Sequence, residues 1–109
     1  MQDLIQELDR MKEELHKSMK MLRQSGEALA QAEHDYQVIK AQTWRILKDE
    51  GCTSTELANI IKGQPKVAEA MFSRDNAKVF YTANQEHINV VKLEMRVIEN
   101  QIAREWNNG

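Results

Sequence analysis

Three histidines, one cysteine and many carboxylates are the side chains with the chemistry for catalysis or metal binding. His16, His34 and His87 lie far apart, and none has a second histidine at the spacing of a helical zinc site. Cys52 has no second thiol, and no neighbouring base marks it as a nucleophile. We expect three solvated surface histidines and a cysteine that packs at a turn.

The carboxylates lie on polar helix faces, many beside lysine or arginine. General acid–base catalysis needs a buried pair with shifted pKa values, and no such pair is indicated. No glycine-rich phosphate loop occurs, and the stretch 62–65 (KGQP) predicts a connection between helices. The sequence therefore predicts no enzyme, no catalytic residue, no metal site and no cofactor.

The charge balance argues against a protein that coats nucleic acid. Fifteen Lys and Arg face seventeen Asp and Glu, for a net charge of −2, whereas such proteins usually carry a basic excess. One cysteine cannot form an internal disulfide, and no signal peptide, membrane span or basic membrane-binding face is visible. We expect a cytoplasmic protein.

DNA reading by residues 53–78 is the competing functional hypothesis. A helix, a short turn with glycine and a second helix resemble a helix-turn-helix. Because the second helix continues far beyond this segment and uses two faces for packing, we rank this interpretation second. The residues that would contact DNA in it are Lys62, Gln64, Lys66, Ser73, Arg74 and Lys78.

The elements that hold these residues follow from hydrophobic spacing. Residues 2–50 carry a heptad whose alternating three- and four-residue steps are typical of a helix paired with another helix. We favour one continuous helix over a break at Ser25-Gly26, because the heptad keeps its phase there. The heptad positions are Leu4, Leu8, Met11, Leu15, Ser18, Leu22, Ser25, Leu29, Ala32, Tyr36, Ile39, Thr43 and Ile46.

Local signals predict a turn and two more helices. Gly51 is typical of the residue after a helix end, and Thr53 with Glu56 forms a capping-box pattern. A short helix over about 54–62 and a long one over about 64–106 follow, with Pro65 in the first turn of the latter. The second long helix has a stripe at Ala70, Arg74, Ala77, Tyr81, Asn84, Ile88, Val91, Met95, Ile98 and Ile102.

The predicted fold is all-α, one domain over 1–109. It is a long antiparallel coiled-coil hairpin with a short helix at its turn. We expect a three-helix core at that turn and packing roles for Trp44 and Trp106. The turn core would contain Ile39, Ile46, Leu47, Leu57, Ile60, Ile61, Val67 and Met71.

A second apolar stripe lies nearly opposite the first on the last helix. A helix that is apolar on two faces is buried on both sides, and one chain supplies only one long partner helix. We therefore expect a homo-oligomer, most simply a dimer. The alternative is that the short helix covers Phe72 and Val79. The predicted self-association interface is Phe72, Val79, Ala83, Val90, Leu93 and Val97.

Further residues resemble a known group of proteins. The stretches 33–36 (EHDY), 61–63 (IKG), 67–68 (VA), 74–75 (RD), 92–93 (KL) and 104–106 (REW), with Tyr81, Arg96 and Glu99, carry the likeness. They resemble small coiled-coil proteins encoded by phages and prophages of Gram-positive bacteria, often among replication or recombination genes. Because that group has no assigned activity, the resemblance implies an accessory factor in the host cytoplasm and no catalytic residue. The predicted function is a non-enzymatic helical scaffold that binds itself and another, unidentified protein.

Overall fold

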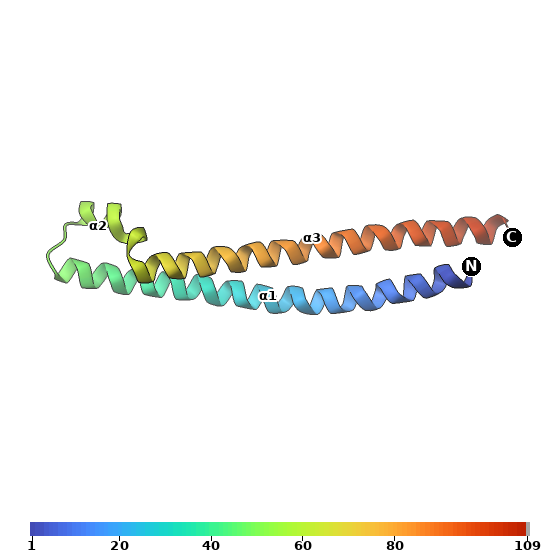
Figure 1. The fold of residues 1–109 in the computed structure, drawn as a ribbon, viewed down its shortest axis with the longest axis horizontal. Coiled ribbons are helices and arrows are strands. Elements are labelled where there is room, and N and C mark those ends of the chain that lie inside the picture. Colours follow the sequence, from blue (N-terminus) through green and yellow to red (C-terminus); the bar gives the residue numbers. More distant parts are fainter. Residues whose placement is uncertain (109) are drawn as a thin grey trace. The chain divides into compact units, whose positions relative to one another are not determined.

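The computed structural model describes residues 1–108, and every regular element in that range is helical (Figure 1). Helix α1 spans Gln2–Asp49, the short helix α2 spans Ser54–Ile60, the 3₁₀ helix η1 spans Ile61–Gly63, and α3 spans Pro65–Asn108. α1 packs against α3, and α2 lies at the turn between them. The predicted all-α hairpin with a short helix at its turn is confirmed.

The end of α1 follows from the conformational freedom of glycine. Gly51 adopts a φ of 104°, a left-handed conformation that side chains with a Cβ rarely take. This conformation lets the N–H of Gly51 donate to the carbonyl of Lys48, and that of Cys52 donate to the carbonyl of Leu47, both at 3.1 Å. The two bonds are the Schellman pattern of a helix end. The predicted role of Gly51 is confirmed.

The starts of α2 and α3 also follow from local chemistry. Thr53 Oγ1 accepts from the N–H of Glu56 at 3.2 Å, and Glu56 Oε2 accepts from the N–H of Thr53 at 3.3 Å. This reciprocal pair is the predicted capping box. Pro65 is the first residue of α3, where its missing N–H costs no helical bond. The carbonyl of Gln64 accepts the first bond of α3, from Ala68 at 2.8 Å.

The chain divides into two compact units. The terminal unit consists of Met1–Gln24 with the described part of Tyr81–Gly109, and the turn unit is Ser25–Phe80. α1 is unbroken over its whole length, so the expected continuity across Ser25-Gly26 is confirmed. A single domain over 1–109 stays a prediction.

In the terminal unit, the heptad stripe of α1 meets the first stripe of α3. The N-terminal amine of Met1 lies 3.3 Å from Oε2 of Glu105, so the start of α1 lies beside the end of α3 and the helices run antiparallel. Apart from Ser18, the residues buried between them are apolar, as heptad pairing requires. They are Met11, Ser18, Ile88, Val91 and Ile98.

In the turn unit, η1 and the first turns of α3 pack on α1. The buried cluster is Tyr36, Ile61, Val67 and Ala70, with Ile39, Trp44 and Met71 packed against it. Leu57 is also fully buried and is the only described residue of α2 in that class. The packing role predicted for Trp44 is confirmed. Of the predicted turn core, all but two residues are at least partly buried.

Those two residues, Ile46 and Ile60, are exposed. Ile46 lies on the last turns of α1, which extend past the beginning of α3 (Figure 1). Ile60 ends α2, where the backbone leaves α-helical geometry with a φ of −111°. A helix of seven residues has little surface to bury, and Leu57 occupies the inner position. The prediction that these two isoleucines belong to the core is therefore wrong.

Candidate interaction surface

The side chains with catalytic or metal-binding chemistry do not converge. His16 and His34 are exposed, and Cys52 is half-buried. His87 Nε2 lies 3.1 Å from Oε1 of Glu14 across the two helices of the terminal unit. Within residues 1–108, no three His, Cys, Asp or Glu side chains are grouped to hold a metal ion. None of the helices described there is long and apolar enough to cross a membrane.

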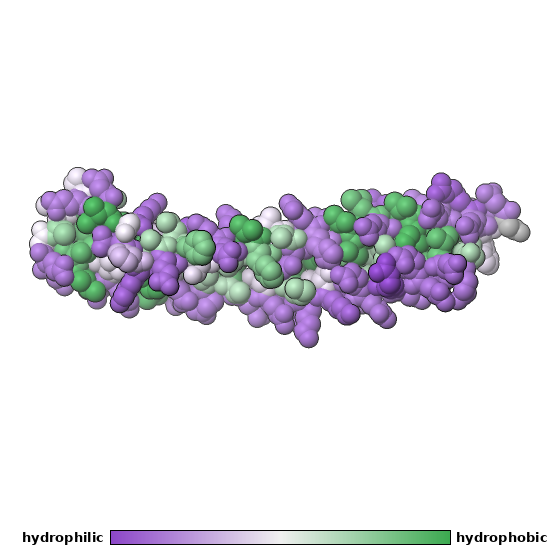
Figure 2. Space-filling model, viewed as in Figure 1, coloured by the Kyte–Doolittle hydropathy of each residue, from purple (hydrophilic) through white to green (hydrophobic). Residues whose placement is uncertain are grey.

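One face of α3 in the terminal unit is apolar and uncovered. Val90 is 50% exposed, and Leu93 and Val97 are each 57% exposed. Ala83, on the same face, is exposed as well. Figure 2 shows hydrophobic side chains among hydrophilic ones over the C-terminal half of α3. These four residues are the terminal-unit members of the predicted self-association interface, and none packs into its own unit's core.

Trp106 lies near the end of α3 and is also exposed. The sequence predicts a packing role for it. Trp106 follows Ile102 by four residues, so it lies on the inward stripe of α3. The amine of Met1 lies beside Glu105, so α1 starts level with this turn and offers little surface opposite the tryptophan. The expected packing role of Trp106 is therefore wrong for the single chain.

The turn unit carries its own exposed aromatic and aliphatic side chains on α3. Phe72 is 72% exposed and Val79 is 68% exposed, so α2 does not cover them. The alternative in which the short helix folds over these two residues is thus excluded for the single chain. Phe80 is exposed too and was not singled out from the sequence. It lies beside Val79, between the two stripes, where heptad counting assigns no role.

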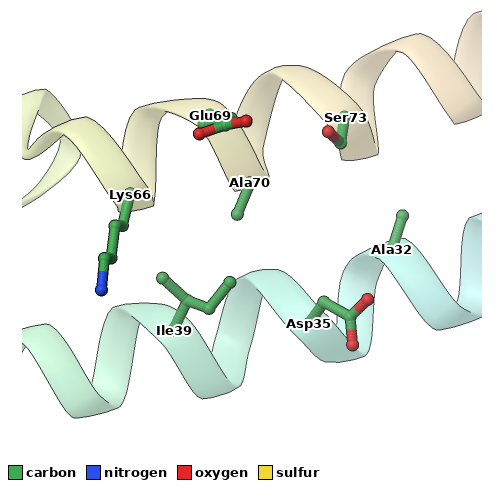
Figure 3. A pocket seen from close by; sticks show the side chains of 7 residues that line it. All are labelled: Ala32, Asp35, Ile39, Lys66, Glu69, Ala70 and Ser73. Carbon is green, nitrogen blue, oxygen red and sulfur yellow. The ribbon is translucent and has the colours of Figure 1, made fainter.

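A groove between α1 and α3 forms in the turn unit because small residues face each other. The groove has a volume of about 290 Å³, and in Figure 3 Ala32 and Ile39 of α1 and Ala70 of α3 point into the space between the helices. Asp35, Lys66, Glu69 and Ser73 line its edges. Its charged side chains have mixed sign and are exposed to solvent, so the groove has no buried polar group to select a ligand.

The predicted DNA contacts fall into two groups. Lys62, Lys66, Ser73 and Lys78 are exposed. Gln64 is half-buried, and its side-chain amide donates to the carbonyl of Ile60 at 3.3 Å, so it closes the turn. Arg74 is half-buried as well. The four exposed residues lie on α3 or just before it. The two half-buried residues, Gln64 and Arg74, make contacts inside the turn unit instead.

Arg74 packs on an aromatic ring. Its guanidinium carbon lies 4.4 Å from the ring centroid of Tyr36, and Lys40 Nζ lies 5.8 Å from the same centroid. Nη2 of Arg74 donates to Oδ1 of Asp75 at 2.9 Å. This hydrogen bond raises the pKa of the Arg74 guanidinium further above its ordinary value. A cation over an aromatic face is a favourable contact, which explains how an arginine fits the helix seam.

Sequence reasoning missed contacts between residues that lie far apart in the chain, among them Arg74 with Tyr36 and His87 with Glu14. A signal for the contact between His87 and Glu14 existed, since both residues flank the heptad stripes, where antiparallel partners come close.

Comparison of the chain with protein-family models, with curated proteins and with solved structures gives no match.

Proposed function

We propose that this protein is a non-enzymatic helical scaffold that self-associates through α3 and holds another protein. The observation that carries the proposal is the exposure of Val90, Leu93 and Val97, which lie on one face of a helix whose opposite face is already buried. Burial of such side chains is the main driving force for protein association. A contiguous apolar patch that one chain leaves open is typical of an interaction site.

The resemblance to coiled-coil proteins of Gram-positive phages extends the proposal to a biological setting. In that setting the protein acts in the host cytoplasm as an accessory factor linked to replication or recombination. The single cysteine, which cannot pair within one chain, is compatible with a reducing compartment.

DNA reading by 53–78 is the competing function. The exposed Lys62, Lys66 and Lys78 favour it, whereas Arg74 is committed to Tyr36 and Asp75. A salt-titrated DNA-binding assay separates the two functions. DNA binding that weakens steeply with salt, and that is lost in the Lys62→Glu/Lys66→Glu variant, would favour a DNA-binding function over the scaffold function.

The scaffold is tested by light scattering on the wild type and on Leu93→Glu. A carboxylate at the centre of a buried face is costly, so we expect Leu93→Glu to shift the protein toward monomer. Gln85→Glu is the matched control, because Gln85 is an exposed residue of the same helix that lies off the apolar face. Equal molar masses for all three proteins at every concentration would contradict the proposal.

A further inference from the structure

The exposed apolar face in the terminal unit has opposite charges at its two ends. Along α3, Glu86, Val90, Leu93, Val97 and Arg104 fall on one stripe, and all five are exposed. A shallow hollow of about 510 Å³ reaches from Val97 to Arg104, between the apolar centre and the basic end. The face is therefore acidic at one end, apolar in the middle and basic at the other end.

This order of charges selects the direction of a second copy. A parallel pair of α3 helices would set Glu86 against Glu86 and Arg104 against Arg104, both repulsive. An antiparallel pair whose two-fold axis passes midway between Leu93 and Val97 sets Glu86 against Arg104 of the second copy, and does so twice. The same axis sets Leu93 against Val97 of the second copy, also twice. The face is complementary to itself only in the antiparallel direction.

A neighbouring antiparallel register is less favourable. Moving the axis to a point between Val90 and Leu93 pairs those two residues but sets Glu86 against Val97 of the second copy. A carboxylate desolvated against an apolar side chain without a partner is costly. The first register brings Glu94 near Glu94 of the second copy. Glu94 flanks the face and is exposed, so water and salt screen the repulsion between these two carboxylates.

We propose that two copies of this chain pair through α3 of their terminal units, antiparallel, with Leu93 against Val97 and Glu86 against Arg104. This inference rests on the self-association proposed above and adds its direction and register. It makes the interface isologous, because each copy contributes the same stripe to it. Such a contact closes on itself and limits assembly through this face to two chains.

Disulfide trapping tests the direction. In a Cys52→Ser background, Val90→Cys and Asn100→Cys are prepared separately, then unfolded together and refolded as an equimolar mixture. The proposed register puts position 90 level with position 100 of the second copy, within the Cα separation that a disulfide spans. Position 90 of one copy and position 90 of the second copy are offset by ten residues, or about 15 Å along the helix axis. Oxidation should therefore cross-link the mixture and neither single variant.

The outcomes separate this inference from the proposed function. Cross-linking of each single variant by itself would establish a parallel pair, and the antiparallel inference would be wrong although self-association stands. A dimer by light scattering that cross-links in no combination would overturn the register. A wild type that stays monomeric at every concentration would overturn the proposed function as well.

Charge exchange tests the same register without cysteines. Glu86→Arg and Arg104→Glu each place like charges opposite each other twice, and we expect each to weaken the dimer about tenfold. The double variant Glu86→Arg/Arg104→Glu restores opposite charges and should regain wild-type affinity. Because both side chains are exposed, the variants should fold alike by circular dichroism. Additive weakening in the double variant would refute the pairing.

Discussion

Truncation of Leu93 should destabilise the protein in a way that depends on protein concentration, whereas truncation of Ile88 should not. Both residues lie on α3 in the terminal unit, but Ile88 is 6% exposed on the face toward α1 and Leu93 is 57% exposed on the other face. Ile88→Ala removes buried methyl groups and leaves a cavity, at a cost of about 2–5 kcal/mol. That cost belongs to the single chain, so it should be the same at all protein concentrations.

The cost of Leu93→Ala depends on the second copy. Full burial of a leucine side chain is worth about 2 kcal/mol, and covering the exposed half of Leu93 is therefore worth about 1 kcal/mol per chain. A dimer contains this contact twice, so the variant should lose about 2 kcal/mol of dimer stability, or about 30-fold in its dissociation constant. In a dissociated single chain, Leu93→Ala should lower the free energy of unfolding only slightly.

The assay is urea unfolding followed by circular dichroism, at one protein concentration where the wild type is dimeric and one where it is dissociated. Ile88→Ala should lower the unfolding midpoint equally at both, and Leu93→Ala should lower it clearly only at the higher one. If Leu93→Ala is as destabilising as Ile88→Ala in the dissociated protein, the leucine is buried within one chain. If it has no effect at either concentration, nothing covers the face. Either result refutes the reasoning.

Three further predictions concern the turn and an ion pair. Leu57→Ala should cost about 2–5 kcal/mol in urea unfolding, because the side chain is fully buried. Gly51→Ala should cost about 1–2 kcal/mol because of the positive φ, while Gly63→Ala, with open space around a Cβ, should be neutral or slightly stabilising by the same assay. The hydrogen bond from Arg10 holds the pKa of Glu7 below its ordinary value. The Glu7–Arg10 pair therefore stabilises the folded protein at pH values above the ordinary glutamate pKa. This contribution is lost as the pH falls through the lowered pKa of Glu7. Glu7→Gln should lower Tm at neutral pH, and the difference from wild type should vanish in strong acid.

The features that sequence predicts well are those that local physics decides. Gly51 ends α1 because few other residues adopt its backbone conformation, and Thr53 with Glu56 begins α2 because two free amides find acceptors within one turn. The inward stripes follow from helical periodicity, which needs no knowledge of the partner. These signals act within a few residues, so the element bounds and the buried faces could be stated in advance.

The features that sequence reasoning missed depend on which residues of the two helices come level. Spacing places Arg74 in the inward stripe of the second long helix, and only the competing hypothesis gives it a DNA contact; neither identifies Tyr36, over which its guanidinium lies. Ile46 matches the apolar pattern of α1 and is nonetheless exposed. In each case the helical period gives the face of the helix on which a side chain lies, and it does not give the residue that faces that side chain on the other helix. The register between α1 and α3 supplies that information, and local patterns do not determine it.

Sedimentation equilibrium of the wild-type protein over a wide range of concentrations shows whether the exposed face of α3 is a self-association surface. One chain has a mass of 12.7 kDa. We expect an apparent mass that rises with concentration toward twice this value, and a Leu93→Glu variant whose mass stays near that of one chain. A wild type that sediments as a single chain at every concentration would contradict this expectation.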